Sequence, residues 1–448
     1  MRLLAFLKHQ SPINGSQPKF TFGGRALFCL LLCLGIAGSS KTAMAQAGSL
    51  APTFGNNGIF TTNFTQVDAS IAIAVALQSD GKIIAGGAVP SGVSQTVALV
   101  RRNTNGTLDT TFGSGGFVTN DFGVEFAEVY GIAVLSDGKI VAAAEGITGG
   151  SIGRFNSNGS VDTTFGINGF AVSNQVNGEG GPAAMAIQPD GDIIVTGNSV
   201  MARYTAEGAL DPTFGTDGIA PLGGGFASGI VLQPDGKILI TSGSSASHQV
   251  STVPPQLPAA SQGVIARYKT NGSLDQSFGI SGQAASVTSV AGIALQSDGK
   301  IVVAGTINSQ LIVGSNQTGF GLVRYNTNSG IDTSFGTRGG VITGFPPAAA
   351  GFALVIQTNG DIVVAGQTIT GTGSFATSFA LARYTSAGRL DPTFGTGGKV
   401  TTTLGSNTVS WISSLVLQTD GKIVAVGNTG ANTGEFLDNF VVARYLTQ

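Results

Sequence analysis

Short apolar runs separated by turn residues fill the chain beyond residue 50, and none of these runs has the apolar spacing of a helix. Seven of them lead into an Asp-Gly or Asn-Gly pair that is followed by a second β-type run, as in LQSDGKI at 77–83 and LQTDGKI at 417–423. Such a pair between two apolar runs is typical of a tight hairpin. We therefore expect seven β-hairpins, each with a type I′ turn.

A second motif lies between the hairpins. An apolar run ends in Arg and an aromatic residue, a polar turn follows, and Thr-Phe-Gly or Ser-Phe-Gly leads into the next run, as in FALARYTSAGRLDPTFGTGGKV at 379–400. In the first copy Arg102 stands in place of the aromatic residue. The Arg and the Phe are 11 residues apart in six copies: Arg101 and Phe112, Arg154 and Phe165, Arg203 and Phe214, Arg267 and Phe278, Arg324 and Phe335, and Arg383 and Phe394.

Each period holds four β-type runs, and there are seven periods. This pattern predicts an all-β fold, a seven-bladed β-propeller of four-stranded antiparallel blades. An open β-solenoid is the alternative, although its coils are usually shorter than this period. The chain starts in mid-unit at residues 50–55 and ends in mid-unit at residues 441–445. We expect the N-terminal strand to complete the last blade and close the ring, although blades built from one repeat each would give the same count.

The recurring residues suit structural roles. We expect the Phe of each Thr-Phe-Gly to fill the wedge between neighbouring blades, and the Gly after it to take a positive φ. Each Arg precedes an Asp by 8 residues, so we expect the two to pair, or the Asp to accept hydrogen bonds from turn amides. A ring of calcium ligands is the alternative for these Asp residues. Ala51 stands where the Asp of the closing blade would be, so Arg444 should lack this partner.

At this point the repeats resemble a known family. LQSDGKIVVAG at 295–305, FALARY at 379–384 and LDPTFGTGGKV at 390–400 recur in a fixed order and are similar to the delta-60 repeat family of predicted β-propellers. The resemblance covers about residues 48–448. It implies the propeller fold and no particular activity, because that family has no general assigned activity.

The N-terminus has the features of a targeting segment. An apolar run of 13 residues, 26–38, is shorter than the roughly 20 residues of a membrane-spanning helix and precedes Ala-Met-Ala at 43–45. We expect residues 1–45 to be a signal peptide cleaved after Ala45, and residues 46–448 to form one domain. A retained membrane anchor is the alternative. The protein is then secreted, periplasmic or on the cell surface, and we expect a monomer without a stable membrane span.

Composition narrows the chemistry. Only 10% of residues are charged and the net charge is −2, so neither nucleic acid nor an anionic membrane surface is an expected partner. Both cysteines, Cys29 and Cys33, lie in the signal segment, and His248 is the only histidine beyond it. This excludes Cys-His catalysis and argues against a zinc site. We assign no catalytic residue, cofactor or metal.

Two of the four connections in each repeat vary in length, and alternation of strand direction places both on one face. Variable loops on a rigid scaffold are where binding usually resides, so we place the functional surface on that face. The longest connection, residues 244–262, should lie over or beside the central channel. The acidic residues outside the repeats form the candidate binding patch: Asp121, Glu125, Glu128, Glu145, Glu435 and Asp438.

The patch has more than one interpretation. It could bind a cation or hold a carboxylate pair for glycoside chemistry, or its members could be scattered solvated acids. We expect a non-enzymatic binding or structural module for a carbohydrate, a surface polymer or a protein. The alternative is a hydrolase or lyase acting on a polysaccharide or lactone at the channel mouth. Trp411, the one tryptophan, suits packing better than sugar stacking.

Overall fold

The computed structural model describes the unit Ala45–Gln448, within which the residues outside the description are 63, 65–69, 92–93, 125, 147–148, 174–183, 198, 224–225, 244–262, 287–288, 309–317, 371–375 and 433–438. Residues 1–44, which include almost all of the predicted signal peptide, also lie outside the described residues. Every element of the described part is a β-strand. No helix in it is long and apolar enough to cross a membrane.

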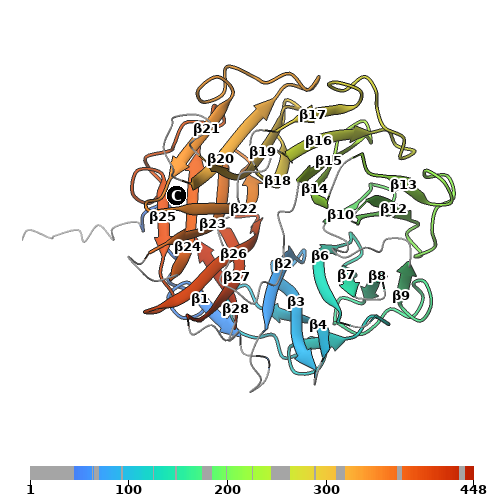
Figure 1. Ribbon diagram of the computed structural model, residues 1–448. Coiled ribbons are helices and arrows are strands. Elements are labelled where there is room, and N and C mark those ends of the chain that lie inside the picture. Colours follow the sequence, from blue (N-terminus) through green and yellow to red (C-terminus); the bar gives the residue numbers. More distant parts are fainter. Residues whose placement is uncertain are drawn as a thin grey trace, which may run out of the picture. The chain divides into compact units, whose positions relative to one another are not determined.

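Seven four-stranded antiparallel sheets follow one another in a ring within this unit, which confirms the predicted propeller (Figure 1). The innermost strands are β2 (Ile71–Leu77), β6 (Glu128–Val134), β10 (Ala184–Ile187), β14 (Phe226–Leu232), β18 (Ser289–Leu295), β22 (Ala349–Ile356) and β26 (Thr408–Leu417). The second strands are β3 (Ile83–Ser91), β7 (Ile140–Gly146), β11 (Ile193–Thr196), β15 (Ile238–Gly243), β19 (Ile301–Asn308), β23 (Ile362–Ile369) and β27 (Ile423–Ala431). The third strands are β4 (Ser94–Arg102), β8 (Gly149–Phe155), β12 (Val200–Tyr204), β16 (Gly263–Tyr268), β20 (Thr318–Tyr325), β24 (Thr377–Tyr384) and β28 (Asn439–Tyr445). The outermost strands are β5 (Phe117–Asn120), β9 (Phe170–Ser173), β13 (Ile219–Pro221), β17 (Gln283–Ala285), β21 (Gly340–Gly344), β25 (Lys399–Thr402) and β1 (Ile59–Thr62).

The N-terminal strand closes the ring, as predicted. Strand β1 pairs with β28 in the sheet β1-β28-β27-β26, so the last blade takes its outer strand from the start of the propeller. The turn of this blade is rebuilt from both ends of the described chain. Gly48 N donates to Leu446 O (2.7 Å) and Leu446 N donates to Ser49 O (2.9 Å), while in blade 6 Gly388 N donates to Thr385 O (2.8 Å). The closing turn therefore keeps the hydrogen bonds of an unbroken one.

The Asp-Gly turns join hairpins, but the expected type I′ conformation is wrong. In the first turn Gln78 N donates to Lys82 O (2.9 Å) and Gly81 N donates to Gln78 O (2.9 Å), so three residues form the loop. Gly81 has φ +82°, whereas Asp80 is not among the residues with positive φ and instead accepts a hydrogen bond from Lys82 N (3.0 Å). The geometry is that of a type I turn followed by a left-handed Gly, which the Asp side chain stabilises by bonding to the backbone two residues on.

The Phe of each Thr-Phe-Gly or Ser-Phe-Gly is fully buried between blades, as predicted. Phe112, for example, packs with Ile84 and Leu99 of its own blade and with Ile140 and Ala142 of the next. The Gly after each Phe has a positive φ, between +50° and +59°. Its N–H reaches the following blade, and Gly113 N donates to Asn158 O at 2.7 Å. The wedge is thus closed by apolar packing and a backbone hydrogen bond together.

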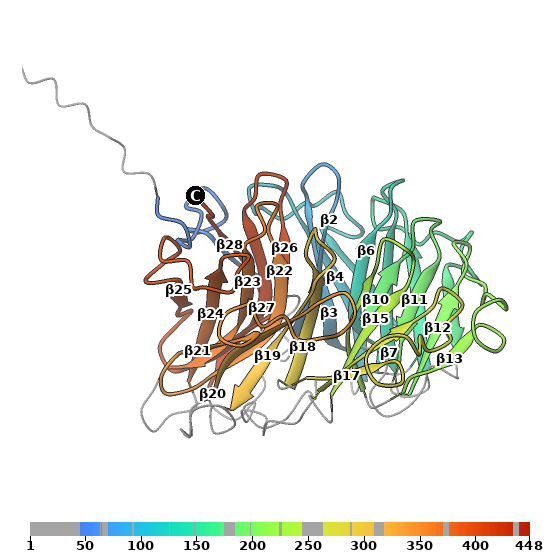
Figure 2. The same cartoon turned by 90° about the horizontal axis from the view of Figure 1, so that it is seen from above.

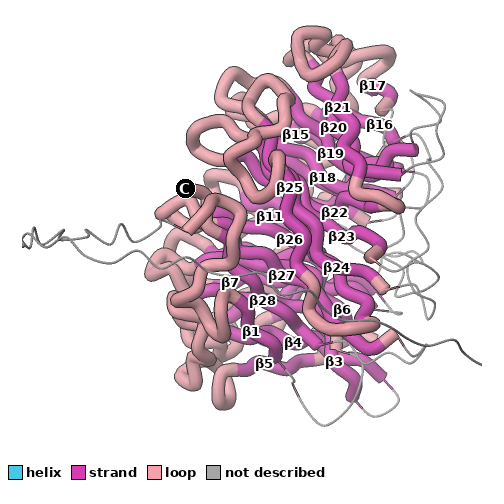
Figure 3. The backbone as a smooth tube through the Cα atoms, turned by 90° about the vertical axis from the view of Figure 1, so that its left-hand side faces the viewer, coloured by secondary structure: helices cyan, strands magenta, loops and turns pink. Residues whose placement is uncertain are grey.

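The two constant connections of each blade lie at the same end of the strands, which we call the turn face; in blade 1 it consists of residues 78–82 and 102–116. Arg101 Nη1 donates to Gln78 Oε1 (3.1 Å), so the two connections are in contact. Figure 3 shows the described turns gathered along one side of the strands, and Figure 2 shows the strands from above. The opposite end, where β3 ends and β4 begins, is the loop face.

Arg102 departs from the repeat in a way the structure explains. In blades 6 and 7 the aromatic residue at this position donates its hydroxyl to a threonine of the preceding blade: Tyr384 to Thr343 Oγ1 (2.7 Å) and Tyr445 to Thr402 Oγ1 (3.0 Å). Arg102 reaches the matching residue, Thr62, through Nη2. Its guanidinium lies 3.8 Å from the Phe60 ring centroid, its Nε has no hydrogen-bond partner, and burial lowers its pKa to about 10.

Replacing Arg102 with tyrosine should raise the free energy of unfolding by about 1–2 kcal/mol, because it removes a buried charge and keeps the bond to Thr62. Urea denaturation at neutral pH measures this change. The reverse replacement, Tyr384→Arg, buries a charge where none exists and should lower stability by more than this gain. A loss of stability in Arg102→Tyr would show that the guanidinium has a favourable role at this seam.

Candidate functional site

The repeated Arg and Asp form a buried or half-buried ion pair in six blades, which confirms the predicted pairing. The distance from Arg Nε to Asp Oδ2 lies between 2.7 and 2.9 Å in every case: Arg101–Asp109, Arg154–Asp162, Arg203–Asp211, Arg267–Asp275, Arg324–Asp332 and Arg383–Asp391. These Asp side chains are thus occupied by Arg, which disfavours the calcium alternative. In the described part of the chain, no three Asp, Glu, His or Cys side chains gather in a way that could hold a metal ion.

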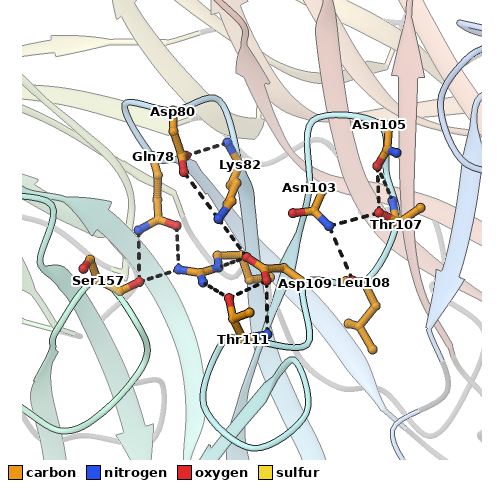
Figure 4. Close-up of polar contacts among 11 residues, drawn as sticks. Gln78, Asp80, Lys82, Asn103, Asn105, Thr107, Leu108, Asp109, Thr111 and Ser157 are labelled. Atoms are coloured by element: carbon orange, nitrogen blue, oxygen red, sulfur yellow. Dashed lines mark hydrogen bonds and ion pairs between the residues drawn. The ribbon is translucent and has the colours of Figure 1, made fainter.

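Asp109 shows how fully such a carboxylate is used (Figure 4). Its Oδ1 accepts hydrogen bonds from Thr111 N (3.1 Å) and Thr111 Oγ1 (2.6 Å), and its Oδ2 lies 3.0 Å from Lys82 Nζ. Burial alone would raise the pKa of Asp109, but the hydrogen bonds from Thr111 and Lys82 and the charge of Arg101 outweigh it and hold that pKa well below its usual range. No lone pair remains for a ligand.

The same Arg residues tie each blade to the next around the whole ring. In all seven blades Nη1 donates to a turn carbonyl of the following blade: Arg101 to Ser157, Arg154 to Ala206, Arg203 to Thr270, Arg267 to Thr327, Arg324 to Ser386, Arg383 to Thr447 and Arg444 to Thr104. Arg444, whose blade has Ala51 in place of Asp, keeps this bond but leaves Nε without a partner, as predicted. The repeated Arg side chains of the turn face therefore have structural roles.

A hollow of about 400 Å³ lies on the turn face between blades 5 and 6, beside Arg324 and the turn residues Asp298 and Asn359. Its one cationic group is already engaged, because Arg324 Nη1 donates to Gln296 Oε1 (3.0 Å) and to Ser386 O (2.6 Å). The hollow therefore offers no free charge to a ligand.

The candidate acidic patch divides into members that the structure describes and members that it does not. Glu125, Glu435 and Asp438 lie outside the described residues, as does the loop 244–262 with His248. Asp121 is exposed in a turn, where its Oδ1 accepts a hydrogen bond from Gly123 N (3.0 Å).

Glu128 and Glu145 were expected on connecting loops, but they lie in strands. Glu128 is the first residue of β6 and Glu145 lies near the end of β7. Both are at the loop-face end of blade 2, since the Asp-Gly turn joins the other ends of these strands. The pair belongs to the innermost hairpin of the blade, next to the axis of the ring (Figure 1).

A β-bulge brings the two carboxylates together. Counted outward from the Asp-Gly turn, the strands pair regularly as far as Gly131, which lies opposite Ala143. The next pair is Val129 opposite Ala144, so Tyr130 has no residue opposite it and is an extra residue in β6. Because neighbouring residues of a strand point to opposite faces, this shift of one residue places Glu128 directly opposite Glu145 on the same face of the sheet. Without the bulge, Glu128 would oppose Gly146.

Tyr130 completes the cluster and was missed from the sequence. Its hydroxyl donates to Glu128 Oε2 (3.1 Å) and also interacts with Glu145; burial and the two acidic neighbours raise the pKa of Tyr130. Glu128 is 7% exposed and its Oε1 is buried without a hydrogen-bond partner. Burial first, with a further contribution from Glu145, raises the pKa of Glu128 to about 7, although the hydrogen bond from Tyr130 opposes the rise.

The other blades show that the fold does not require acids here. At the same cross-strand register, five described blades carry neutral pairs: Ile71 and Ala88, Phe226 and Gly243, Ser289 and Thr306, Ala350 and Gln367, and Trp411 and Asn428. Asn428 clamps two blades together, because its amide bonds to both Ala72 N (2.7 Å) and Ala72 O (3.0 Å). Like charges directly opposite each other destabilise a sheet, so the Glu128–Glu145 pair opposes folding stability.

Family comparison agrees with the repeat pattern. The model of a family described as a β-propeller domain of unknown function, DUF5122, matches residues 78–112, 135–165, 188–214, 260–278, 296–335 and 357–394. These segments, which cover less than half of the chain, are similar to the repeats of that family, whose function is unknown. The matched segments include the Asp-Gly or Asn-Gly turns of five blades and the Arg-to-Phe segments of six, so the likeness covers most of the turn face. Glu128 lies outside the matched segments.

Solved structures share the fold at low sequence identity. A structure of streptogramin B lyase is 14% identical, with a TM-score of 0.50 over 86% of this chain and 98% of that chain. Sqt1 from Chaetomium thermophilum is 13% identical, with a TM-score of 0.49 over 90% of this chain and 100% of that one. A gluconolactonase from Xanthomonas campestris is 12% identical, with a TM-score of 0.39 over 85% and 99%. No curated protein sequence matches the chain significantly. The likeness to streptogramin B lyase shows the fold alone.

Proposed function

We propose that the protein is an exported β-propeller that acts as a binding module, with the loop face around Glu128 and Glu145 as its ligand-binding surface. The observation that carries this proposal is the contrast between its two faces. The repeated Arg and Asp groups of the turn face are consumed by bonds within and between blades. On the loop face, blade 2 carries a pair of acids where five other blades carry neutral residues. One buried oxygen of this pair, Glu128 Oε1, has no hydrogen-bond partner.

An enzymatic function is the second candidate, as a hydrolase or lyase acting on a polysaccharide or lactone. One observation favours it, because burial raises the pKa of Glu128 to about 7, which suits a general acid near neutral pH. The same burial of Glu128 argues against an enzymatic function. A carboxyl that is 7% exposed is out of reach of a sugar ring, whereas Tyr130 and Glu145 are partly exposed. Binding of a small group at the exposed side of the pair fits this geometry better than bond cleavage.

The location of the contacts supports export with cleavage after Ala45. The ring is bonded from Gln46 and Ala47 onward: Ala47 O accepts from Gly395 N (2.7 Å) and Gln46 Nε2 donates to Gly395 O (2.5 Å). Cleavage there would leave every closing bond in place. The fixed order of the three repeat motifs further supports assigning the repeats to the delta-60 type, and we propose a monomeric protein whose ligand is a carbohydrate, a surface polymer or another protein.

An array of glycans and peptides tests the binding function. The full chain is expressed with its own leader, the exported form is purified, and mass spectrometry should find Gln46 at its N-terminus. We expect that form to bind a subset of the array, and Glu128→Gln/Glu145→Gln to lose this binding while Asp298→Asn on the turn face keeps it. Turnover of an arrayed polysaccharide or lactone, or binding lost through the turn-face variant alone, would contradict the proposal.

A further inference from the structure

The Glu128–Glu145 site is short of a positive charge. Buried carboxylates are normally paired with a cation, and in six blades the buried Asp of the repeat has its Arg. Every Lys and Arg beyond residue 45 lies in the described residues, and none of them pairs with Glu128. The one group that bonds to Glu128 is the hydroxyl of Tyr130, which is neutral.

The surroundings of Glu128 supply no cation from any side. Strand β6 packs against β2, β3, β4, β7 and β10. Strands β2, β3 and β10 have no titratable side chain, and β7 contributes only Glu145. In β4 the two arginines are at the turn-face end, where Arg101 pairs with Asp109 and Arg102 lies over Phe60. In the preceding connection Asp121 is acidic and exposed.

The pair is also poorly suited to clamp blades 2 and 3 together. In blade 7, Asn428 performs that role, because its Oδ1 accepts from Ala72 N and its Nδ2 donates to Ala72 O. Glu145 stands at the Asn428 position, and an ionised carboxylate has no N–H to donate. Glu145 therefore cannot make the same pair of bonds.

We propose that Glu128, Tyr130 and Glu145 form a binding site for a protonated amine. This inference rests on the proposed binding function and names its ligand chemistry. An ammonium group carries N–H donors for the Glu145 carboxylate and the Tyr130 hydroxyl oxygen, and one positive charge that compensates the Glu128 carboxylate behind them. A divalent cation fits less well, because calcium takes six to eight oxygen ligands and the described residues offer no third acid.

Glu145 and Tyr130 are partly exposed, so the ligand seats against them, and its charge compensates the buried Glu128 carboxylate behind them. Two sources carry this chemistry, the lysine side chain of a protein and the amino sugar of a polysaccharide.

Amine binding requires Glu128 to be ionised, which links binding to pH. The lysine amine stays protonated throughout the range, since its pKa is about 10, whereas an amino-sugar amine has a pKa of about 8 and is only partly protonated at pH 8. Because burial raises the pKa of Glu128 to about 7, binding of the lysine amine should release a proton near neutral pH and weaken roughly tenfold for each pH unit below 7. Between pH 8 and pH 5.5 the affinity for the lysine amine should fall by about 30-fold, and that for the amino sugar by less.

Calorimetric titration of the full mature protein tests the site with two matched probe pairs. Glucosamine is compared with N-acetylglucosamine, and Nα-acetyl-lysine amide with its Nε-acetylated form, each at pH 8 and pH 5.5. The site variant is Glu145→Gln, which is expected to fold because glutamine stands at this register in blade 6 as Gln367. The control variant is Asp298→Asn, an exposed acid on the turn face.

We expect both amines to bind at pH 8, their acetylated forms not to bind, the affinity to drop at pH 5.5 more for the lysine derivative than for glucosamine, and Glu145→Gln but not Asp298→Asn to abolish binding. A tighter complex with glucosamine points to an amino-sugar source, and a tighter complex with the lysine derivative to a protein source. Equal binding of acetylated probes, or binding of calcium alone, would overturn the amine site. A neutral glycan bound independently of Glu145 would overturn it while leaving the proposed binding function standing.

Discussion

Replacing Asp109 with alanine should lower the free energy of unfolding by about 3–5 kcal/mol at neutral pH, because it leaves the buried Arg101 guanidinium without its carboxylate and removes one of the two carboxylates that pair with Lys82. Both Asp109 and Arg101 are close to fully buried, so water cannot replace the lost partner. Arg101 also donates to Ser157 O in blade 2. The change therefore weakens the joint between two blades as well as the turn itself.

Chemical denaturation of the purified variant measures this effect. Asp121→Ala serves as the matched control, because it removes an exposed Asp that accepts only a local backbone hydrogen bond, and it should change stability by less than about 0.5 kcal/mol. The chain also offers the opposite experiment. Ala51→Asp should add the missing carboxylate beside Arg444 and Thr53, and should raise stability. Equal effects of Asp109→Ala and Asp121→Ala would mean that the ion pairs do not hold the ring.

The wild-type protein should lose about 2–3 kcal/mol of stability between pH 5 and pH 8 through Glu128 alone. Burial and Glu145 raise the pKa of Glu128 from 4.5 to about 7, so the folded state binds more protons than the unfolded state between these values. Stability then falls as pH rises through this window, and the full cost is present above pH 7. Removing Glu128 should flatten this slope.

The ion-paired Asp residues behave in the opposite sense and do not obscure this effect. For Asp109, the neighbouring donors and the Arg101 charge hold the pKa of the carboxyl well below its usual range. The stabilisation from this ion pair is therefore fully present above about pH 4 and is lost only in more acidic solution. The pH dependence is read from the difference between the wild-type protein and Glu128→Gln across the window. A slope that persists unchanged in the variant would assign it to another group.

Repetition explains why the fold could be predicted. One local geometry is made seven times, so each motif is seen in several copies, and the spacing of Arg to Phe indicates which connection is constant. Departures from the repeat were visible in the sequence as well. Ala51 stands where the Asp should be, which predicted that Arg444 Nε would lack a partner, and the structure confirms this. The turn type was predicted wrongly, because Asp-Gly is compatible with two loop lengths, and the side-chain bond from Asp80 to Lys82 N stabilises the longer one.

The site was harder to predict, because it depends on a register shift. Glu128 and Glu145 were noted as acids near the loop face, but counting outward from the Asp-Gly turn puts them on opposite faces of the sheet. Only the extra residue in β6, Tyr130, brings them opposite each other. The sequence did contain a usable signal. When the hairpins are aligned on their turn glycine, the two acids of blade 2 occupy positions at which the other described blades have neutral residues.

The central claim is that the Glu128–Glu145 pair serves a ligand at the expense of the fold, and the unfolding free energy of Glu128→Gln/Glu145→Gln at pH 8 tests it most directly. Removing two opposed acids, one of them buried with its pKa raised to about 7, should make the unliganded double variant more stable than the wild-type protein by about 2–3 kcal/mol. The gain should shrink to below about 1 kcal/mol at pH 5. A double variant that is less stable than the wild-type protein at pH 8 would show that the pair is part of the framework.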